Sequence, residues 1–144
     1  MRETYRVLKP GGTFLFSVWD AIEQNDLART ARDVISKFFA DNPPDFYDVP
    51  FSFHNADTIR SNLTVAGFKD IQLTLLPFPS IAVSASAATT GLIHGNPIIA
   101  AIRERDETRI PEIEAVLEGS IADRYGAAPV AAKMQALICE AWRK

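Results

Sequence analysis

A sharp reversal near the start of the chain constrains its fold more than any other feature. The Lys-Pro-Gly-Gly run at residues 9–12 follows a short segment that reads as the last turns of a helix. Proline cannot continue a helix, and glycine readily adopts the left-handed turn that ends one. In the run that follows, 13–19, both alternating sets of side chains are mostly apolar. This pattern is typical of a central strand in a covered, mostly parallel sheet, and its aromatic content favours that interpretation over a short buried helix.

Two more strands and several helices are predicted downstream. Apolar and polar residues alternate at 69–76, which indicates a strand with one wetter face that Pro77 and Pro79 end. The segment 131–142 indicates a further strand with apolar residues on both faces. The sequence therefore predicts an α/β fold with a three-stranded sheet and helical cover. Apolar residues at helical spacing predict helices in the second half of 20–41, over 55–67, from 98 onward and after Pro111. The segment 84–94 is small and Ala/Thr-rich, and residues 95–97 separate it from the helix that begins at 98.

Composition excludes several classes of protein. Hydrophobic residues make up 47% and charged residues 23% of the 144 residues, which is typical of one globular domain. The net charge is -3 and no basic block occurs, so no nucleic-acid partner is expected. Apolar runs are too short for a membrane helix, so no membrane partner is expected. A single cysteine, Cys139, and two distant histidines offer no disulfide and no metal site, and we expect a cytoplasmic location.

One segment resembles a known family. Residues 2–16, Arg-Glu-Thr-Tyr-Arg-Val-Leu-Lys-Pro-Gly-Gly-Thr-Phe-Leu-Phe, resemble a signature of class I S-adenosylmethionine-dependent methyltransferases. More narrowly, they look like the small-molecule branch that includes the ubiquinone/menaquinone-biosynthesis-like enzymes. In that family such a run ends the helix before the fifth strand. The Ala-Gly-Phe turn at 66–68 is similar to the family's turn before the sixth strand, and 130–144 is similar to its final strand.

The resemblance implies only the C-terminal half of the family's domain. The family's cofactor site lies mainly in the first half, where a glycine-rich turn and an acidic residue hold the cofactor. No Gly-x-Gly-x-Gly occurs in this chain, and the glycines at 11–12 precede the strand as a turn. We expect residues 1–144 to form a single partial domain that lacks the cofactor-binding N-terminal part. S-adenosylmethionine is the cofactor implied for the parent family, and the chain alone is expected to bind none.

The implied sheet leaves one strand without a neighbour. In the family the last three strands lie side by side, with the antiparallel final strand in the middle. Segments 13–19, 69–76 and 131–142 would then form one sheet, and three strands with helical cover can be independently stable. Strand 13–19 would become an apolar free edge, which is a liability. We expect a homodimer that pairs this edge with itself, or a separate N-terminal fragment that pairs with it.

Candidate substrate-binding residues follow the first strand, at the end where open α/β sheets bind ligands. Trp19 is a candidate wall and Asp20 a candidate polar anchor; the alternatives are a core tryptophan and a helix-start aspartate. Tyr47 and Phe51 are candidates for a lid over the methyl acceptor, or for plain packing. His54 is a candidate general base, or a polar residue beside a helix cap. No catalytic, cofactor-binding or metal-binding residue is assigned.

Two functions follow from these patterns. The first is the acceptor-side part of an S-adenosylmethionine-dependent methyltransferase that acts on a small molecule through proximity and orientation, and that is inactive alone. The second is a non-enzymatic, self-associating α/β module derived from a methyltransferase. A glycine-rich strand-turn-helix encoded in frame upstream would favour the first function. The sequence identifies neither the methyl acceptor nor the atom that is methylated.

Overall fold

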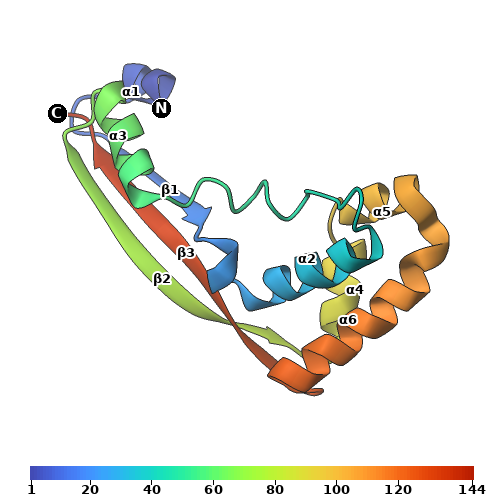
Figure 1. Ribbon diagram of the computed structural model, residues 1–144. Helices are drawn as coiled ribbons and strands as arrows, with labels where there is room; N and C mark the ends of the chain where they lie inside the picture. The colour runs from blue at the N-terminus through green and yellow to red at the C-terminus, as the bar shows by residue number, and fades with distance from the viewer. The chain divides into compact units, whose positions relative to one another are not determined.

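The chain forms two compact units in the computed structural model, which describes residues 1–144 (Figure 1). The sheet unit comprises Met1–Ala21, Phe51–Pro77 and Gln135–Lys144. The helical unit comprises Ile22–Pro50 and Phe78–Met134. Two long strands contribute residues to both units. Each unit has buried apolar side chains of its own, so each is described by itself.

A three-stranded sheet is the centre of the sheet unit. Its strands are β1 (Thr13–Trp19), β2 (Asp70–Ala82) and β3 (Val130–Trp142), and their order is β1-β3-β2. β3 runs antiparallel to β1, with Thr13 opposite Trp142 and Trp19 opposite Ala136. Figure 1 shows β2 running opposite to β3 as well. The three predicted strands and the central place of the last one are confirmed.

Two helices cover one face of this sheet. They are α1 (Arg2–Val7) and α3 (Ala56–Ala66), which lie over the same side of the strands in Figure 1. The side chain of Asn55 caps α3 by accepting a hydrogen bond from the Thr58 N–H at 2.8 Å, and Gly67 ends α3 with a φ of 111°. Both ends agree with the prediction. The core under these helices consists of Ile59, Leu63, Ala66, Phe68, Leu137, Cys139 and Ala141.

The other face of the sheet is open, which corrects one expectation. The apolar residues on both faces of 13–19 predicted a strand with both faces covered by other parts of the protein. β1 lies at an edge of the sheet, which confirms the free edge expected for 13–19, and its burial alternates residue by residue. Phe14 and Phe16 pack on the core, whereas Leu15 is 62% exposed and Trp19 is 42% exposed. The strand is apolar on both sides although this structure covers only one.

β2 extends beyond its predicted end. Pro77 and Pro79 were expected to stop the strand, yet it continues to Ala82. Proline lacks the N–H that a sheet ladder needs, but an edge strand directs half of its backbone groups away from its neighbour. The two prolines are two residues apart, so their nitrogens point the same way. An edge position for β2 therefore accommodates both of them.

The Lys-Pro-Gly-Gly turn joins α1 to β1 and is tied to the end of the chain. Gly11 has a φ of 79°, and a Cβ on Gly12 would approach the Lys9 carbonyl oxygen to 2.9 Å, so both positions favour glycine. The Gly11 N–H donates to the Arg143 carbonyl at 2.7 Å. The Arg143 guanidinium donates to the carbonyls of Tyr5 and Leu8 near the end of α1, and lies 5.0 Å from the Tyr5 ring centroid.

The helical unit packs its helices on one another. Its main helices α2 (Asp26–Phe38), α4 (Ala85–His94) and α6 (Ile110–Tyr125) are in mutual contact. α5 (Ile98–Asp106) packs on α4, and short 3-10 turns occur at Ile22–Gln24 and Glu107–Arg109. Pro111, which was predicted to begin a helix, lies in the first turn of α6. Fully buried side chains include Ile35, Ile93, Ile98, Ile102, Ile113, Leu117, Ile121 and Val130.

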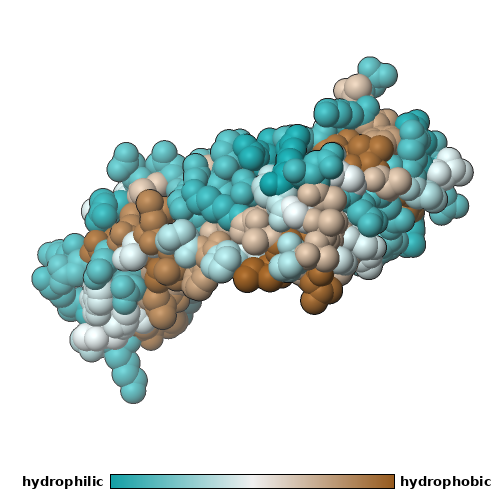
Figure 2. Space-filling view, turned by 90° about the horizontal axis from the view of Figure 1, so that it is seen from below, coloured by the Kyte–Doolittle hydropathy of each residue, from teal (hydrophilic) through white to brown (hydrophobic).

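The surface mixes hydrophilic residues with apolar patches, as Figure 2 shows for one face. The large apolar side chains that remain exposed include Leu15 and Trp19 on β1, and Leu75, Phe78 and Ile81 on β2. None of the helices combines the length and the apolar character needed to cross a membrane.

Candidate functional site

The carboxyl end of β1 brings together two of the predicted aromatic residues. Trp19 is the last residue of β1, and Phe51 begins the segment that leads into α3. Their ring centroids lie 6.0 Å apart with the planes inclined by 36°, which is a favourable tilted arrangement. Phe51 is buried, whereas part of Trp19 stays accessible. A flat apolar molecule could therefore pack on Trp19 without displacing the ring beneath it.

Asp20 is fixed directly after Trp19. One carboxylate oxygen accepts a hydrogen bond from the Gln135 side-chain amide, and the other accepts from the Ala21 N–H at 2.7 Å. The Asp20 N–H also donates to the Gln135 carbonyl at 3.1 Å, which continues the ladder between β1 and β3. These bonds hold the carboxylate in one orientation.

His54 adds a titratable group to the same unit. It lies immediately before the cap of α3 and is exposed. Its Nδ1 is 2.6 Å from the Phe51 carbonyl oxygen. A carbonyl can only accept, so Nδ1 must carry the proton in this bond. In the neutral ring Nε2 is then the acceptor nitrogen, which is the state that a general base requires.

Tyr47 belongs to the helical unit and is built into its core. Its side chain is buried, and its hydroxyl donates to the Leu92 carbonyl at 2.8 Å. Burial raises the pKa of the Tyr47 hydroxyl well above its usual value. The Phe46 ring packs edge-on against it, with centroids 5.2 Å apart. Tyr47 thus lies in the helical unit, whereas Trp19, Asp20, Phe51 and His54 belong to the sheet unit.

Gln135 is a site residue that sequence analysis missed. It binds Asp20 through both its side chain and its backbone, although the two residues are 115 positions apart. Only the register of β3 on β1 makes them neighbours. That register follows from pairing Thr13 with Trp142, which sequence patterns did not specify.

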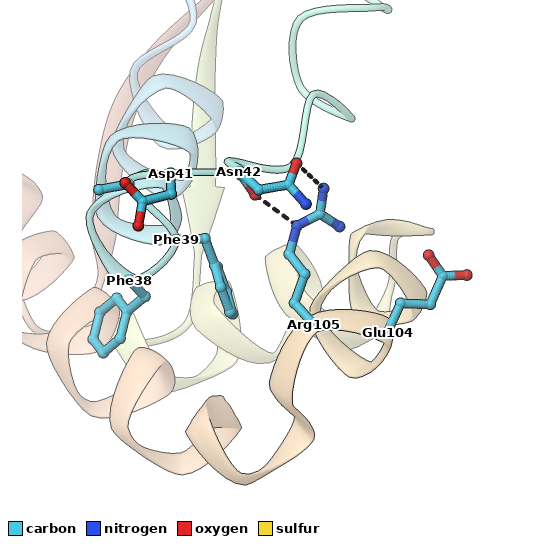
Figure 3. A pocket seen from close by; sticks show the side chains of 7 residues that line it. Phe38, Phe39, Asp41, Asn42, Glu104 and Arg105 are labelled. Carbon is cyan, nitrogen blue, oxygen red and sulfur yellow. Dashed lines mark hydrogen bonds between the residues drawn. The ribbon is translucent and has the colours of Figure 1, made fainter.

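A hollow lies in the helical unit, between the end of α2 and α5 (Figure 3). Its volume is about 440 Å³, and Phe38, Phe39, Asp41, Asn42, Glu104 and Arg105 line it. Arg105 donates through Nε to the Asn42 backbone carbonyl at 2.7 Å and through Nη1 to the Ala101 carbonyl at 2.8 Å. In Figure 3 the Asp41 and Glu104 carboxylates point away from each other. Arg105 therefore holds the chain after α2 in place, and no set of polar groups converges on a ligand.

Neither a metal centre nor a reactive thiol is formed by the described residues. No three His, Cys, Asp or Glu side chains gather closely enough to hold a metal ion. Cys139 lies buried in β3, and burial raises the pKa of its thiol, which disfavours the reactive thiolate. The Gly11 N–H donates to the Arg143 carbonyl and the Gly12 N–H donates to the Lys9 carbonyl. The Gly-Gly turn therefore offers no backbone donors that could bind a phosphate or carboxylate. The residues present therefore do not form a cofactor site of the glycine-rich type.

Comparison with known proteins gives a structural likeness and no sequence match. No protein-family model matches the chain, and no curated protein matches it. Among solved structures, a provisionally assigned methyltransferase of Bacillus halodurans C-125 is similar, with a TM-score of 0.45 and 15% sequence identity. The likeness covers 99% of this chain and 60% of that protein, so the chain spans less than two thirds of its length.

Proposed function

We propose that the chain is the acceptor-side part of an S-adenosylmethionine-dependent methyltransferase acting on a small molecule. The observation that carries the proposal is the contact between the rings of Trp19 and Phe51 at the carboxyl end of β1, with His54 hydrogen-bonded to the Phe51 carbonyl. Ligands of open α/β sheets bind outside the carboxyl ends of the strands. The turn at 9–12 that introduces β1 is the one that resembles the methyltransferase signature, and the narrower small-molecule branch is part of the proposal.

The roles of the residues follow from their contacts. Trp19 would form a wall against which a flat acceptor packs, and Phe51 would hold that wall from behind. Asp20, held by Gln135, would accept a hydrogen bond from a hydroxyl or amine of the acceptor. His54 would take the proton that such a group loses when it is methylated, because its Nε2 is the acceptor nitrogen.

The donor side of the reaction is assigned to another part of the protein or to another chain. Residues 1–144 contain no glycine-rich cradle, and the N–H of Gly11 in the turn at 11–12 already donates a hydrogen bond to the Arg143 carbonyl. We therefore propose that residues 1–144 are one partial domain, inactive and without bound S-adenosylmethionine when alone. No catalytic step is derived through the methyl donor.

Acceptor binding is tested through the fluorescence of Trp19. The chain has two tryptophans, so Trp142→Phe leaves Trp19 as the only reporter. Titration with a small phenol such as catechol should quench this emission saturably, and Phe51→Ala should weaken the apparent affinity about tenfold. The matched control is Trp19→Phe, in which Trp142 should respond only linearly. Equal, non-saturable quenching of both tryptophans would sink the acceptor-site proposal.

Donor binding is tested by calorimetric titration with S-adenosylhomocysteine. We expect no binding heat from the chain alone, because its residues form no cradle for the cofactor. Saturable one-to-one binding would contradict the division into donor and acceptor parts. Methyl transfer by the purified chain would contradict the proposal that it is inactive alone.

A second candidate function is supported by a different observation. β1 ends the sheet with a seven-residue strand that carries no charged side chain. Natural sheets usually protect such edges, because exposed backbone groups recruit other strands. A non-enzymatic, self-associating module would use this edge as its functional surface. It would associate without any response to phenols, which separates it from the first candidate.

A further inference from the structure

The two edges of the sheet differ in their protection. The β2 edge contains Pro77 and Pro79, and proline on an edge strand blocks the addition of another strand. The β1 edge contains neither proline nor a charged residue, and no bulge interrupts its register with β3. The same sheet thus closes one edge to strand addition and leaves the other available.

The hydrogen-bonding direction of each β1 residue follows from the ladder. The Asp20 N–H donates to Gln135, and the Arg143 N–H donates to Gly12, so the even-numbered residues of this stretch face β3. In an antiparallel pair such residues alternate with residues whose backbone groups point away. The N–H and C=O groups of Thr13, Leu15, Ser17 and Trp19 therefore point toward the free edge.

Side chains beside this edge are complementary to one another. Leu15 projects from the open face and is 62% exposed. Two residues along the same strand, the small side chain of Ser17 lies in a hollow of about 240 Å³ lined by Leu15, Phe16, Ser17 and Ile138. Ser17 pairs with Ile138 across the ladder, so the floor of the hollow is largely apolar. The strand carries a projecting side chain and a hollow on the same face.

We infer that β1 is the pairing surface for a second copy of this chain, related by a two-fold axis at Phe16. An antiparallel partner centred there places Leu15 opposite Ser17 of the partner subunit, and Thr13 opposite Trp19 of the partner subunit. All four outward-facing residues then exchange backbone hydrogen bonds. By symmetry each Leu15 side chain fills the hollow of the other copy, which is the self-complementarity of an isologous interface. Centring the axis on Leu15 would leave Trp19 without a partner in the opposite strand, and centring it on Ser17 would leave Thr13 without one.

This inference uses only the geometry of the edge and does not rest on the methyltransferase assignment. An N-terminal fragment that paired with β1 would need the same backbone groups, so the two partners exclude each other. The symmetric dimer is therefore the state of the chain without such a fragment.

Molecular mass in solution tests the pairing. By light scattering the chain should have twice its monomer mass of 15.9 kDa. Leu15→Lys places a charge in the hollow and should reduce the mass to that of the monomer, as should Ser17→Lys. Val65→Lys is the matched control, because Val65 is 64% exposed on α3, away from the edge, and should leave the dimer intact. A monomeric unaltered chain overturns the inference, as does a dimer that both edge variants preserve while circular dichroism shows them folded.

Disulfide trapping tests the register. In a Cys139→Ala background, chains carrying Leu15→Cys mixed with chains carrying Ser17→Cys should cross-link under oxidised glutathione, because opposite residues in this pair have Cα atoms about 5.5 Å apart. Each variant alone should not cross-link. Efficient cross-linking of Leu15→Cys with itself would place the axis on Leu15 and overturn the register. The absence of any cross-link would overturn the pairing, whether or not phenols bind at Trp19.

Discussion

The two units expose apolar side chains in different ways. In the helical unit, α2, α4 and α6 bury their isoleucines against one another, and each helix satisfies its own backbone, so an exposed residue such as Val116 presents only a side chain. In the sheet unit, an exposed residue such as Leu15 presents unpaired backbone groups as well. The helical unit therefore satisfies its backbone hydrogen bonds internally, whereas β1 retains backbone groups that can pair with another strand.

The largest expected effects test whether the two cores act separately. Leu63 and Leu117 are both fully buried, the first in the sheet unit and the second in the helical unit. Truncation of either to alanine should lower the free energy of unfolding by about 2–5 kcal/mol. Both tryptophans lie in the sheet unit, so fluorescence reports that unit, whereas far-UV circular dichroism also reports the helices.

In urea titrations, Leu117→Ala should therefore shift the dichroism transition more than the fluorescence transition. Leu63→Ala should shift the fluorescence transition more. If both probes move together in both variants, the two cores unfold as one cooperative unit and the comparison fails.

An intermediate effect is expected at Tyr47 in the helical unit. Tyr47→Phe removes the hydrogen bond to Leu92 and should cost about 1 kcal/mol at pH 7. Because burial raises the folded-state pKa above the unfolded value of 10.0, the tyrosine stabilises the fold below that pH and ceases to do so as pH rises beyond it. The stability of the variant should accordingly fall less steeply above pH 10 than that of the unaltered chain. Urea unfolding at pH 7 and pH 10.5 measures this, and parallel pH profiles would contradict it.

The smallest effect is expected for ion pairs at the surface. Lys144 lies 2.9 Å from Asp70 in the sheet unit, with both side chains exposed, so Lys144→Ala should cost less than about 0.5 kcal/mol. Arg32 in the helical unit is less exposed and faces Asp33, Asp48 and Glu23, so Arg32→Ala should cost more, about 1 kcal/mol. Thermal denaturation at low and high salt compares the two; an equal loss would mean that the added partners of Arg32 contribute nothing.

Local patterns predicted most of the fold. Turn chemistry at 9–12, the cap at Asn55 and the glycine at 67 all mark real boundaries, because each acts through neighbouring backbone groups. The continuation of β2 beyond Pro77 to Ala82 could not be predicted from the neighbouring residues alone. A proline is tolerated in a strand when its nitrogen points away from the neighbouring strand. That direction is set by the arrangement of strands in the sheet.

The candidate site was predictable in part. Trp19 was predicted as a candidate substrate wall and Phe51 as a candidate lid residue, and the structure places their rings in contact. Tyr47 was grouped with Phe51 because they share a short aromatic segment, but the chain passes from one unit to the other between them. Gln135 escaped notice because its link to Asp20 depends on strand register, which sequence spacing does not encode.

The strand order also determines when the sheet can form during translation. β3 is the middle strand in space and the last of the three strands to leave the ribosome, so β1 and β2 have no sheet partner until residues 130–142 have been synthesised. Through that interval the apolar residues of β1 are available to other nascent chains. Residues 130–143 then supply both the missing strand and, through Arg143, the link back to α1. Chains halted shortly before residue 130 would carry the complete site segment of β1 but no sheet to hold it.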